Sequence, residues 1–189
     1  AVAHDPHDHV HGLGPEGDEV PERVVRRGGL WKAPVRLHLH GMDQVGIEGR
    51  GESVWLGWFV VKTLKLFLPL ARNILEDDAF AVNGYRDKLA PRIDSWQSAL
   101  TTMIEALEQH SWDGQWYRRA TYDNGSWLGS TQSDECQLDS IAQSFAQLSG
   151  AADQKRATQA IDSVLQRLWL KPQKMLLLFK PPFDQTPNN

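Results

Sequence analysis

Hydrophobic residues recur at helical spacing in four stretches of this sequence, all after residue 50. The clearest stretch runs from Arg86 to Gln109, where large apolar residues return every three or four positions. Such residues form one stripe along a helix, and the stripe packs against a neighbouring element. They are Leu89, Ile93, Trp96, Leu100, Met103, Ile104 and Leu107. Similar patterns predict helices over residues 54–75, 133–149 and 154–170.

Polar residues and a glycine mark the expected ends of these helices. Ser53 and Asp153 are residue types that cap helix N-termini, and Gly150 is typical of the position just after a helix. The short apolar run 175–179 has the character of a strand. Helices of this length, joined by alternating short and long loops, predict an all-α fold of stacked αα-hairpins.

Residues 112–130 interrupt the helical pattern. They contain the turn signals Asp113-Gly114 and Asn124-Gly125, which could join short strands. Trp116 and Tyr117 lie beside these turns, where an aromatic ring can present a flat face to a sugar. The chain has 8 Trp, which favours carbohydrate binding only weakly because Trp also fills cores. For Trp55 and Trp58, at the start of an apolar helix, we expect core packing.

The first 40 residues differ in composition from the rest. Six of the seven histidines lie there, together with several prolines, and no helical or alternating pattern persists. We expect residues 1–40 to be irregular, and we place a boundary near Gly41. The histidines are compatible with loose metal binding. No rigid element fixes a geometry for them, so we predict no metal site. They are His4, His7, His9, His11, His38 and His40.

Bulk charge and cysteine content exclude several classes of protein. The formal net charge of -4 and the pI of about 6.0 argue against nucleic-acid binding. The single cysteine, Cys136, cannot form an internal disulfide, and we expect it to be structural. No secretory signal is visible, which predicts a cytoplasmic protein. The apolar segment 54–70 is interrupted by Lys62 and Lys65 and is short for a membrane span, so we predict none.

Four sequence blocks carry a resemblance to a known family. They are GIEGRGESVWLGWF (46–59), WDGQWYRRATYDNGSWLGS (112–130), DECQLDSIAQSFAQLSGAAD (134–153) and LLLFKPPFDQTP (176–187). Their order and spacing resemble the catalytic domain of glycoside hydrolase family 94. The likeness covers about residues 41–187 and is strongest to its cyclic β-1,2-glucan synthase and β-glucan phosphorylase branch.

The resemblance implies a fold and a reaction. The family's catalytic domain is an (α/α)6 toroid, so residues 41–189 would form part of one, built from αα-hairpins. The implied reaction is inverting phosphorolysis of a β-linked glucan. One carboxylic acid protonates the glycosidic oxygen, while inorganic phosphate attacks the anomeric carbon from the opposite face. The resemblance therefore implies a β-glucan oligosaccharide as ligand, inorganic phosphate as co-substrate and no other cofactor.

The sequence departs from the family where the catalytic acid is expected. An Asp-Trp-Asn-Asp run precedes the family's Gly-Met, which aligns with Gly41-Met42, and its last Asp is the acid. Here His40 stands at that position, after His38 and Leu39. Since the whole motif is missing, we interpret the segment before Gly41 as translated out of frame. The chain is then expected to be a fragment that is inactive alone. Its parent enzyme could be a soluble phosphorylase or a synthase associated with the inner membrane.

Seven residues are candidates for substrate binding by this resemblance. They are Glu48, Arg50, Glu52, Trp116, Tyr117, Asp134 and Glu135. Glu52 with Ser53 could instead cap the following helix, and Arg50 could pair locally. Asp134 and Glu135 could instead complement the dipole of a helix that begins beside them. Their adjacency excludes a matched acid and base on one helix face.

Two other functions stay open at this point. One is a non-catalytic glucan-binding module that keeps part of a sugar cleft. The other is a helical interaction protein with a His-rich, metal-binding tail. In a partial toroid, helices would expose apolar faces, which predicts self-association.

Overall fold

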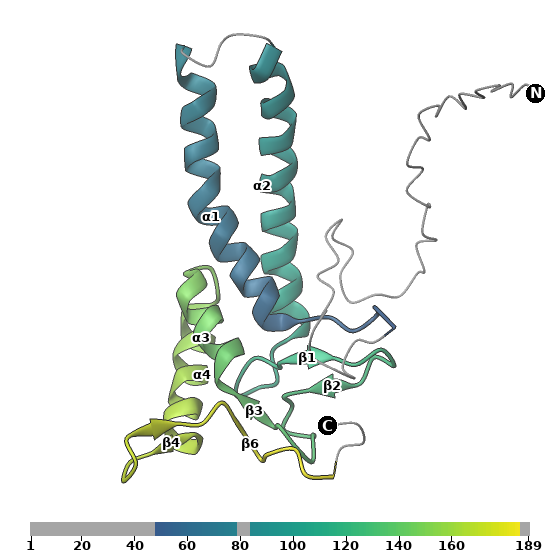
Figure 1. The fold of residues 1–189 in the computed structure, drawn as a ribbon, viewed down its shortest axis with the longest axis vertical. Coiled ribbons are helices and arrows are strands. Elements are labelled where there is room, and N and C mark those ends of the chain that lie inside the picture. Colours follow the sequence, from purple (N-terminus) through teal and green to yellow (C-terminus); the bar gives the residue numbers. More distant parts are fainter. Residues whose placement is uncertain (1–47, 79–83, 186–189) are drawn as a thin grey trace, which may run out of the picture.

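The computed structural model describes residues 48–78 and 84–185. This part contains four helices: α1 (Val54–Glu76), α2 (Tyr85–His110), α3 (Ser140–Ser149) and α4 (Gln154–Arg167). It also contains six short strands: β1 (Ala120–Thr121), β2 (Trp127–Leu128), β3 (Leu138–Asp139), β4 (Trp169–Leu170), β5 (Met175–Leu176) and β6 (Phe179–Lys180). In Figure 1, α1 and α2 form a long hairpin, and the remaining elements gather at one end of it.

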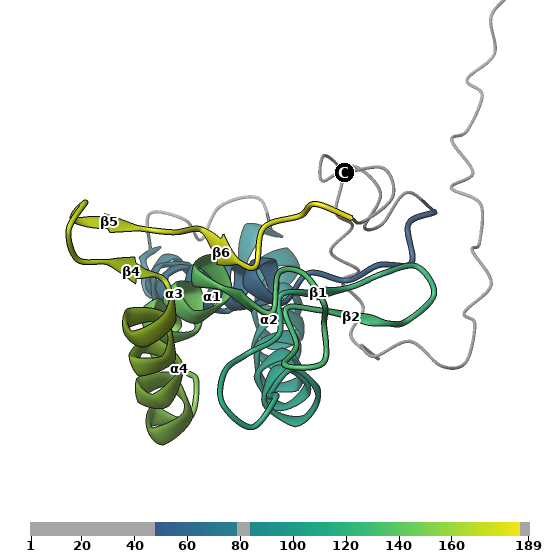
Figure 2. The same ribbon diagram turned by 90° about the horizontal axis from the view of Figure 1, so that it is seen from below.

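The strands form three antiparallel pairs within the described residues: β1 with β2, β3 with β6, and β4 with β5. The first and third pairs are local hairpins. The second joins distant segments, because Leu138 lies opposite Lys180 and Asp139 lies opposite Phe179. This pairing brings the segment after β6 alongside the loop that precedes α3 (Figure 2).

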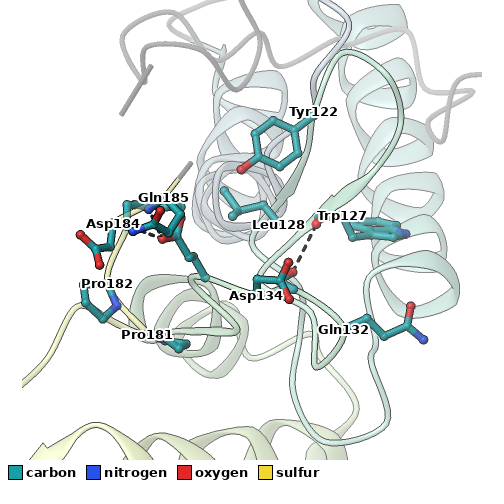
Figure 3. A pocket seen from close by; sticks show the side chains of 12 residues that line it. Tyr122, Trp127, Leu128, Gln132, Asp134, Pro181, Pro182, Asp184 and Gln185 are labelled. Carbon is teal, nitrogen blue, oxygen red and sulfur yellow. Dashed lines mark hydrogen bonds between the residues drawn. The ribbon is translucent and has the colours of Figure 1, made fainter. Parts of the chain in front are cut away.

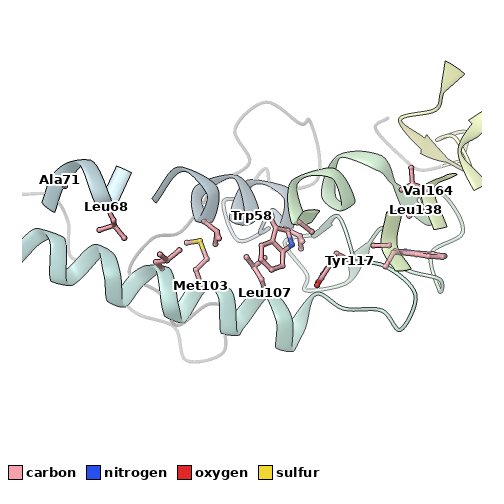
Figure 4. Close-up of a cluster of buried hydrophobic side chains, with 14 of the residues drawn as sticks. Trp58, Leu68, Ala71, Met103, Leu107, Tyr117, Leu138 and Val164 are labelled. Atoms are coloured by element: carbon pink, nitrogen blue, oxygen red, sulfur yellow. The ribbon is translucent and has the colours of Figure 1, made fainter. Parts of the chain in front are cut away.

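α1 is the central helix and packs against both α2 and α3. Its buried residues Trp58, Val61 and Leu68 meet Met103 and Leu107 of α2 in one core cluster (Figure 4). Burying each side chain of this size contributes about 1.5–3 kcal/mol. This cluster holds the helices together and supports the loops at their end.

One side chain of α3 fixes the loop that precedes β1. Gln143 is fully buried, and its carboxamide oxygen accepts from the N–H of Tyr117 at 2.8 Å. Its NH2 group donates to the carbonyls of Tyr117 and Asp139 at 2.7 and 2.9 Å. Trp116 donates its indole N–H to the carbonyls of Gly129 and Gln137 at 3.0 and 2.9 Å. The part of this loop at Trp116 and Tyr117 therefore lies in the interior.

The predicted helix ends are confirmed at three positions. Ser53 caps α1 by accepting from the N–H of Leu56 at 3.4 Å. Asp153 caps α4, and Gly150 is the C-cap of α3. These signals depend on a few neighbouring residues, so they can be recognised in a sequence without knowing the tertiary structure.

Two predicted helix boundaries are wrong. The helix expected over 133–149 begins only at Ser140, because Asp139 caps it and the preceding residues pair with β6. The helix expected to reach residue 170 ends at Arg167, since Trp169 and Leu170 form β4. The run 175–179 does contain strand residues, in β5 and the start of β6.

The predicted all-α class is incomplete. The described chain is helix-rich, and α1–α2 and α3–α4 are packed helix pairs, but the strand pairs are also part of it. The toroidal arrangement of these helices stays a prediction. The expectation that residues 1–40 are irregular falls outside the described residues.

α1 is longer than the apolar segment 54–70 considered in the sequence. By length and composition it could cross a membrane. Buried core helices share these properties, and the buried residues of α1 pack against α2 and α3. Its other face is apolar and exposed at Leu66 and Leu70, with exposed fractions of 61% and 59%.

Candidate functional site

A cleft of about 780 Å³ opens beside the β1–β2 hairpin. One wall is the hairpin and the loop that follows it, and the other wall is the segment 181–185 after β6. Figure 3 shows Tyr122, Leu128 and Asp134 between this segment and Trp127. The lining residues are Tyr122, Trp127, Leu128, Gln132, Ser133, Asp134, Glu135, Pro181, Pro182, Phe183, Asp184 and Gln185.

Trp127 is the tryptophan among the residues that line this cleft. Its ring is half-buried, and the guanidinium of Arg118 lies 4.7 Å from the ring centroid. Arg118 is itself held by Asp113 at 2.7 Å. A cation over an aromatic face is attractive and limits the ring's freedom to turn. Trp127 is therefore an aromatic surface held in place at the edge of the cleft.

The second wall is tied to the first at several points. The N–H of Cys136 donates to the carbonyl of Pro181 at 2.9 Å. The Glu135 carboxylate accepts from the N–H groups of Asp184 and Gln185 at 2.6 and 2.5 Å. Phe183 and Phe179, whose ring centroids are 5.0 Å apart, both pack against an apolar cluster of the first wall. These contacts define the cleft's shape.

A small apolar cluster, formed by Ala120, Leu128 and Cys136, lies against Tyr122 beside the cleft. Burial raises the pKa of Tyr122, and the nearby Cys136 and Glu135 act in the same direction. Burial also raises the pKa of Cys136 to about 12, with Asp139 adding to the effect. Tyr122 is therefore a neutral hydroxyl at ordinary pH, able both to donate and to accept hydrogen bonds.

A buried ion pair joins this cluster to α3. Arg119 pairs with Asp139, and their side chains are 5% and 0% exposed. Burial raises the pKa of Asp139, while Arg119 and the N–H of Ala142 act in the opposite direction. The pair is a structural support, since neither side chain lines the cleft.

The loop of residues 48–51 is fixed by Asp123, the residue after Tyr122. The Asp123 carboxylate accepts from the N–H groups of Glu48, Arg50 and Gly51 at 2.8, 2.7 and 2.9 Å. Burial alone would raise the pKa of Asp123, but these donors and the Arg50 guanidinium lower it overall. The loop that leads into α1 is thereby attached to the hairpin that lines the cleft.

Comparison with known proteins shows the family to which this sequence belongs. The model described as "Glycosyl hydrolase 94 superfamily, catalytic domain" matches residues 27–189. The chain belongs to this family. The match extends upstream of Gly41, where the change in composition led us to expect a boundary, and that boundary stays a prediction.

Relatives in the family include synthases and phosphorylases. The chain is 43% identical over 146 residues to cyclic beta-(1,2)-glucan synthase NdvB of Rhizobium meliloti (strain 1021), covering 77% of this chain and 5% of that protein. It is 32% identical to solabiose phosphorylase of Paenibacillus borealis, covering 67% and 15%. It is 32% identical to N,N'-diacetylchitobiose phosphorylase of Vibrio furnissii, covering 64% and 14%. The chain thus spans a small share of each relative's length.

Asp134 and Glu135 are the predicted site residues that line the cleft. Asp134 is exposed, while Glu135 accepts hydrogen bonds from the opposite wall. Neither begins a helix, so the alternative explanation by helix dipole is wrong: α3 starts five or more residues later, at Ser140. Their roles in substrate binding stay predictions.

Glu48, Arg50 and Glu52 lie on the loop held by Asp123 and at its end. Glu48 and Arg50 form an ion pair with side chains 57% and 51% exposed, as the local-pairing alternative expected for Arg50. The backbone of Glu52 bonds to Thr121, with its N–H donating to the hydroxyl at 3.0 Å. None of the three lines the cleft described above, and their substrate-binding role stays a prediction.

Trp116 and Tyr117 are not available as a sugar platform. Both are fully buried, and the hydroxyl of Tyr117 donates to Glu108 at 2.7 Å. The sequence suggested loop positions for them, but the loop folds inward onto Gln143. The expectation of core packing is correct for Trp58, which is fully buried, whereas Trp55 is half-buried.

Sequence reasoning missed Trp127 and Asp184 as candidates. Trp127 lies two residues after the Asn124-Gly125 turn signal. This turn signal indicates a short hairpin, and Trp127 is the first residue of its second strand. Asp184 lies in a quoted family block, but its place in the cleft depends on the β3–β6 pairing. His40 and the other N-terminal histidines lie outside the described residues. Within those residues, no group of three or more His, Cys, Asp or Glu is arranged to hold a metal.

Proposed function

We propose that the cleft binds a segment of β-linked glucan, as the carbohydrate-binding part of a family 94 catalytic domain. The observation that carries this is the combination of a half-buried Trp127 ring, held by Arg118, with carboxylates and amides among the residues that line one cavity. A pyranose ring offers C–H groups to an aromatic face, and its hydroxyls donate to carboxylates. Pockets that bind small ligands have volumes of about 300–1,000 Å³ and combine apolar side chains with a few polar groups, as this cleft does.

The lining favours a neutral sugar over phosphate. Asp134, Glu135 and Asp184 contribute carboxylates, and none of the described lining residues is Lys or Arg. Bound phosphate is usually held by cationic and amide donors. We therefore assign the glucan to this cleft and expect inorganic phosphate to bind elsewhere in a complete catalytic domain.

The reaction we propose for the complete domain is glucosyl transfer between phosphate and a β-linked glucan, with inversion. A carboxylic acid gives its proton to the glycosidic oxygen as that bond breaks, and a phosphate oxygen bonds to the anomeric carbon. The acid's expected position is occupied by His40 here. We propose that the chain alone binds glucan and does not catalyse turnover.

Titration calorimetry with β-1,2-glucan oligosaccharides tests the binding. Trp127→Ala should weaken affinity about fivefold or more, because a stacking surface is lost. Trp169→Ala is the matched control, since Trp169 is 37% exposed on β4 and does not line the cleft. Equal affinity for an α-linked glucan, or equal losses in both variants, would contradict the proposal.

A phosphate-release assay with glucose 1-phosphate and glucan acceptors tests the lack of turnover. We expect no release from the folded chain. Release that disappears in His40→Ala would show instead that His40 serves as the acid.

A further inference from the structure

Glu135 differs from the other carboxylates around the cleft in what its oxygens contact. Its Oε1 accepts from two consecutive backbone N–H groups, those of Asp184 and Gln185, at 2.6 and 2.5 Å. These donors lie 49 and 50 positions away along the chain. The side chain thus spans the two walls of the cleft. Hydrogen bonds to an ionised acceptor are stronger than those between neutral groups.

The second wall is held at successive points along its length, from β6 to its far end. Pro181 is held by the N–H of Cys136, and Phe183 packs on Phe179. Both contacts act near β6, where the β3–β6 pairing already fixes the backbone. Glu135 holds the farther end, at Asp184 and Gln185, which are exposed. Asp184 lines the cleft in the part of the wall that Glu135 holds.

We infer that Glu135 is a positioning residue, which fixes the second wall in the arrangement that binds sugar. This inference rests on the proposed function of the cleft. It gives Glu135 a role through the backbone of residues 184 and 185. Asp134, beside it on the first wall, is exposed and faces the same cleft, and serves as the comparison.

The expected effect on binding depends on the fraction of molecules in which the second wall has the arrangement that binds sugar. If the carboxylate is removed, the end of the wall leaves its position in most molecules. The apparent dissociation constant then rises by the inverse of the fraction that still has the wall in place. A fall of that fraction to about one tenth would weaken glucan binding about tenfold.

The test combines amide hydrogen exchange, measured by NMR without sugar, with titration of β-1,2-glucan oligosaccharides. Glu135→Ala should remove the protection of the Asp184 and Gln185 amides and weaken binding about tenfold. Glu135→Gln keeps an acceptor oxygen of the same reach, so it should recover part of both properties. Asp134→Ala should leave both amides protected. If Glu135→Ala fails to fold, amide protection and glucan affinity are compared between Glu135→Gln and the wild type. A partial loss of both in Glu135→Gln supports the positioning role, and unchanged values contradict it.

Two outcomes would overturn the positioning role alone. Weaker binding with both amides still protected would mean that Glu135 contacts the sugar directly. Unprotected amides with unchanged affinity would mean that the wall does not shape the site. A folded wild-type chain with protected amides but no glucan affinity would instead overturn the proposed function, and the positioning role with it.

Discussion

Arg119 and Asp139 form an ion pair inside the protein, between the β1–β2 hairpin and α3. Asp139 has a second task, because its Oδ1 accepts from the N–H of Ala142 at 3.0 Å and so caps α3. One carboxylate therefore joins the start of a helix to the hairpin that lines the cleft. Removing one partner of a buried pair leaves the other charge uncompensated, which is the costly case.

Asp139→Asn should destabilise the protein by about 3–5 kcal/mol, since asparagine can still cap the helix but cannot neutralise Arg119. Asp153→Asn is the matched control. Asp153 also caps a helix, accepting from Lys155 and Arg156 at 3.0 Å, but it does so at an exposed site. Its cost should stay below about 1 kcal/mol. Urea unfolding measures both, and similar costs would contradict the buried-pair explanation.

Gly129 should not tolerate a side chain. Its φ of 81° favours glycine, and a Cβ there would lie 2.5 Å from the backbone nitrogen of Arg119. Gly129→Ala should destabilise by about 2–5 kcal/mol, from backbone strain plus overpacking. Gly125 has a similar φ of 84° with nothing within 4 Å of such a Cβ, so Gly125→Ala should cost only about 1–2 kcal/mol. Thermal unfolding measures the stability of both variants. The loss in Gly125→Ala reports backbone strain alone, and the additional loss in Gly129→Ala reports the steric clash.

Cys136 should resist thiol reagents in the folded protein. It is fully buried, and burial raises its pKa to about 12, so little thiolate is present at pH 8. Maleimide labelling at pH 8 should be at least about 100-fold slower in the native protein than in urea. Similar rates in both conditions would place the thiol at the surface and contradict its structural role.

The loop of residues 48–51 should stay attached to the hairpin at mildly acidic pH. The folded-state pKa of Asp123 is lowered, so the folded protein binds this proton less readily than the unfolded chain. Its contribution to stability is thus present above the ordinary carboxyl pKa of about 4 and is lost as the pH falls through the lowered value. Amide exchange at Glu48 and Gly51 measures this attachment. In Asp123→Asn, the amides should exchange faster even at pH 7.

Local signals in the sequence predicted the helices well. Ser53 and Asp153 cap α1 and α4 because capping needs only a side-chain oxygen and the N–H groups two or three residues later. The apolar stripe of α2 followed directly from residue spacing. The resemblance of four sequence blocks then predicted the family, which hydrophobic periodicity alone could not indicate.

The cleft was less predictable because long-range contacts build it. Asp134 and Glu135 were expected to begin a helix, but they lie in a bend, and Leu138, paired with Lys180, belongs to β3 and not to the helix. Trp116 was a candidate sugar platform, but its indole N–H donates to two carbonyls inside the protein. In each case, the deciding partner lies more than a dozen residues away.

Gln143 shows how hydrogen bonds to distant residues restrict the residue type at one position. Its carboxamide receives one hydrogen bond from Tyr117 and gives two, to the carbonyls of Tyr117 and Asp139. A glutamate of nearly the same shape would present an acceptor to those carbonyls, and a leucine would leave three backbone groups without this partner. Position 143 is therefore restricted by the direction of its hydrogen bonds, and a replacement chosen by size or hydropathy alone would fail there.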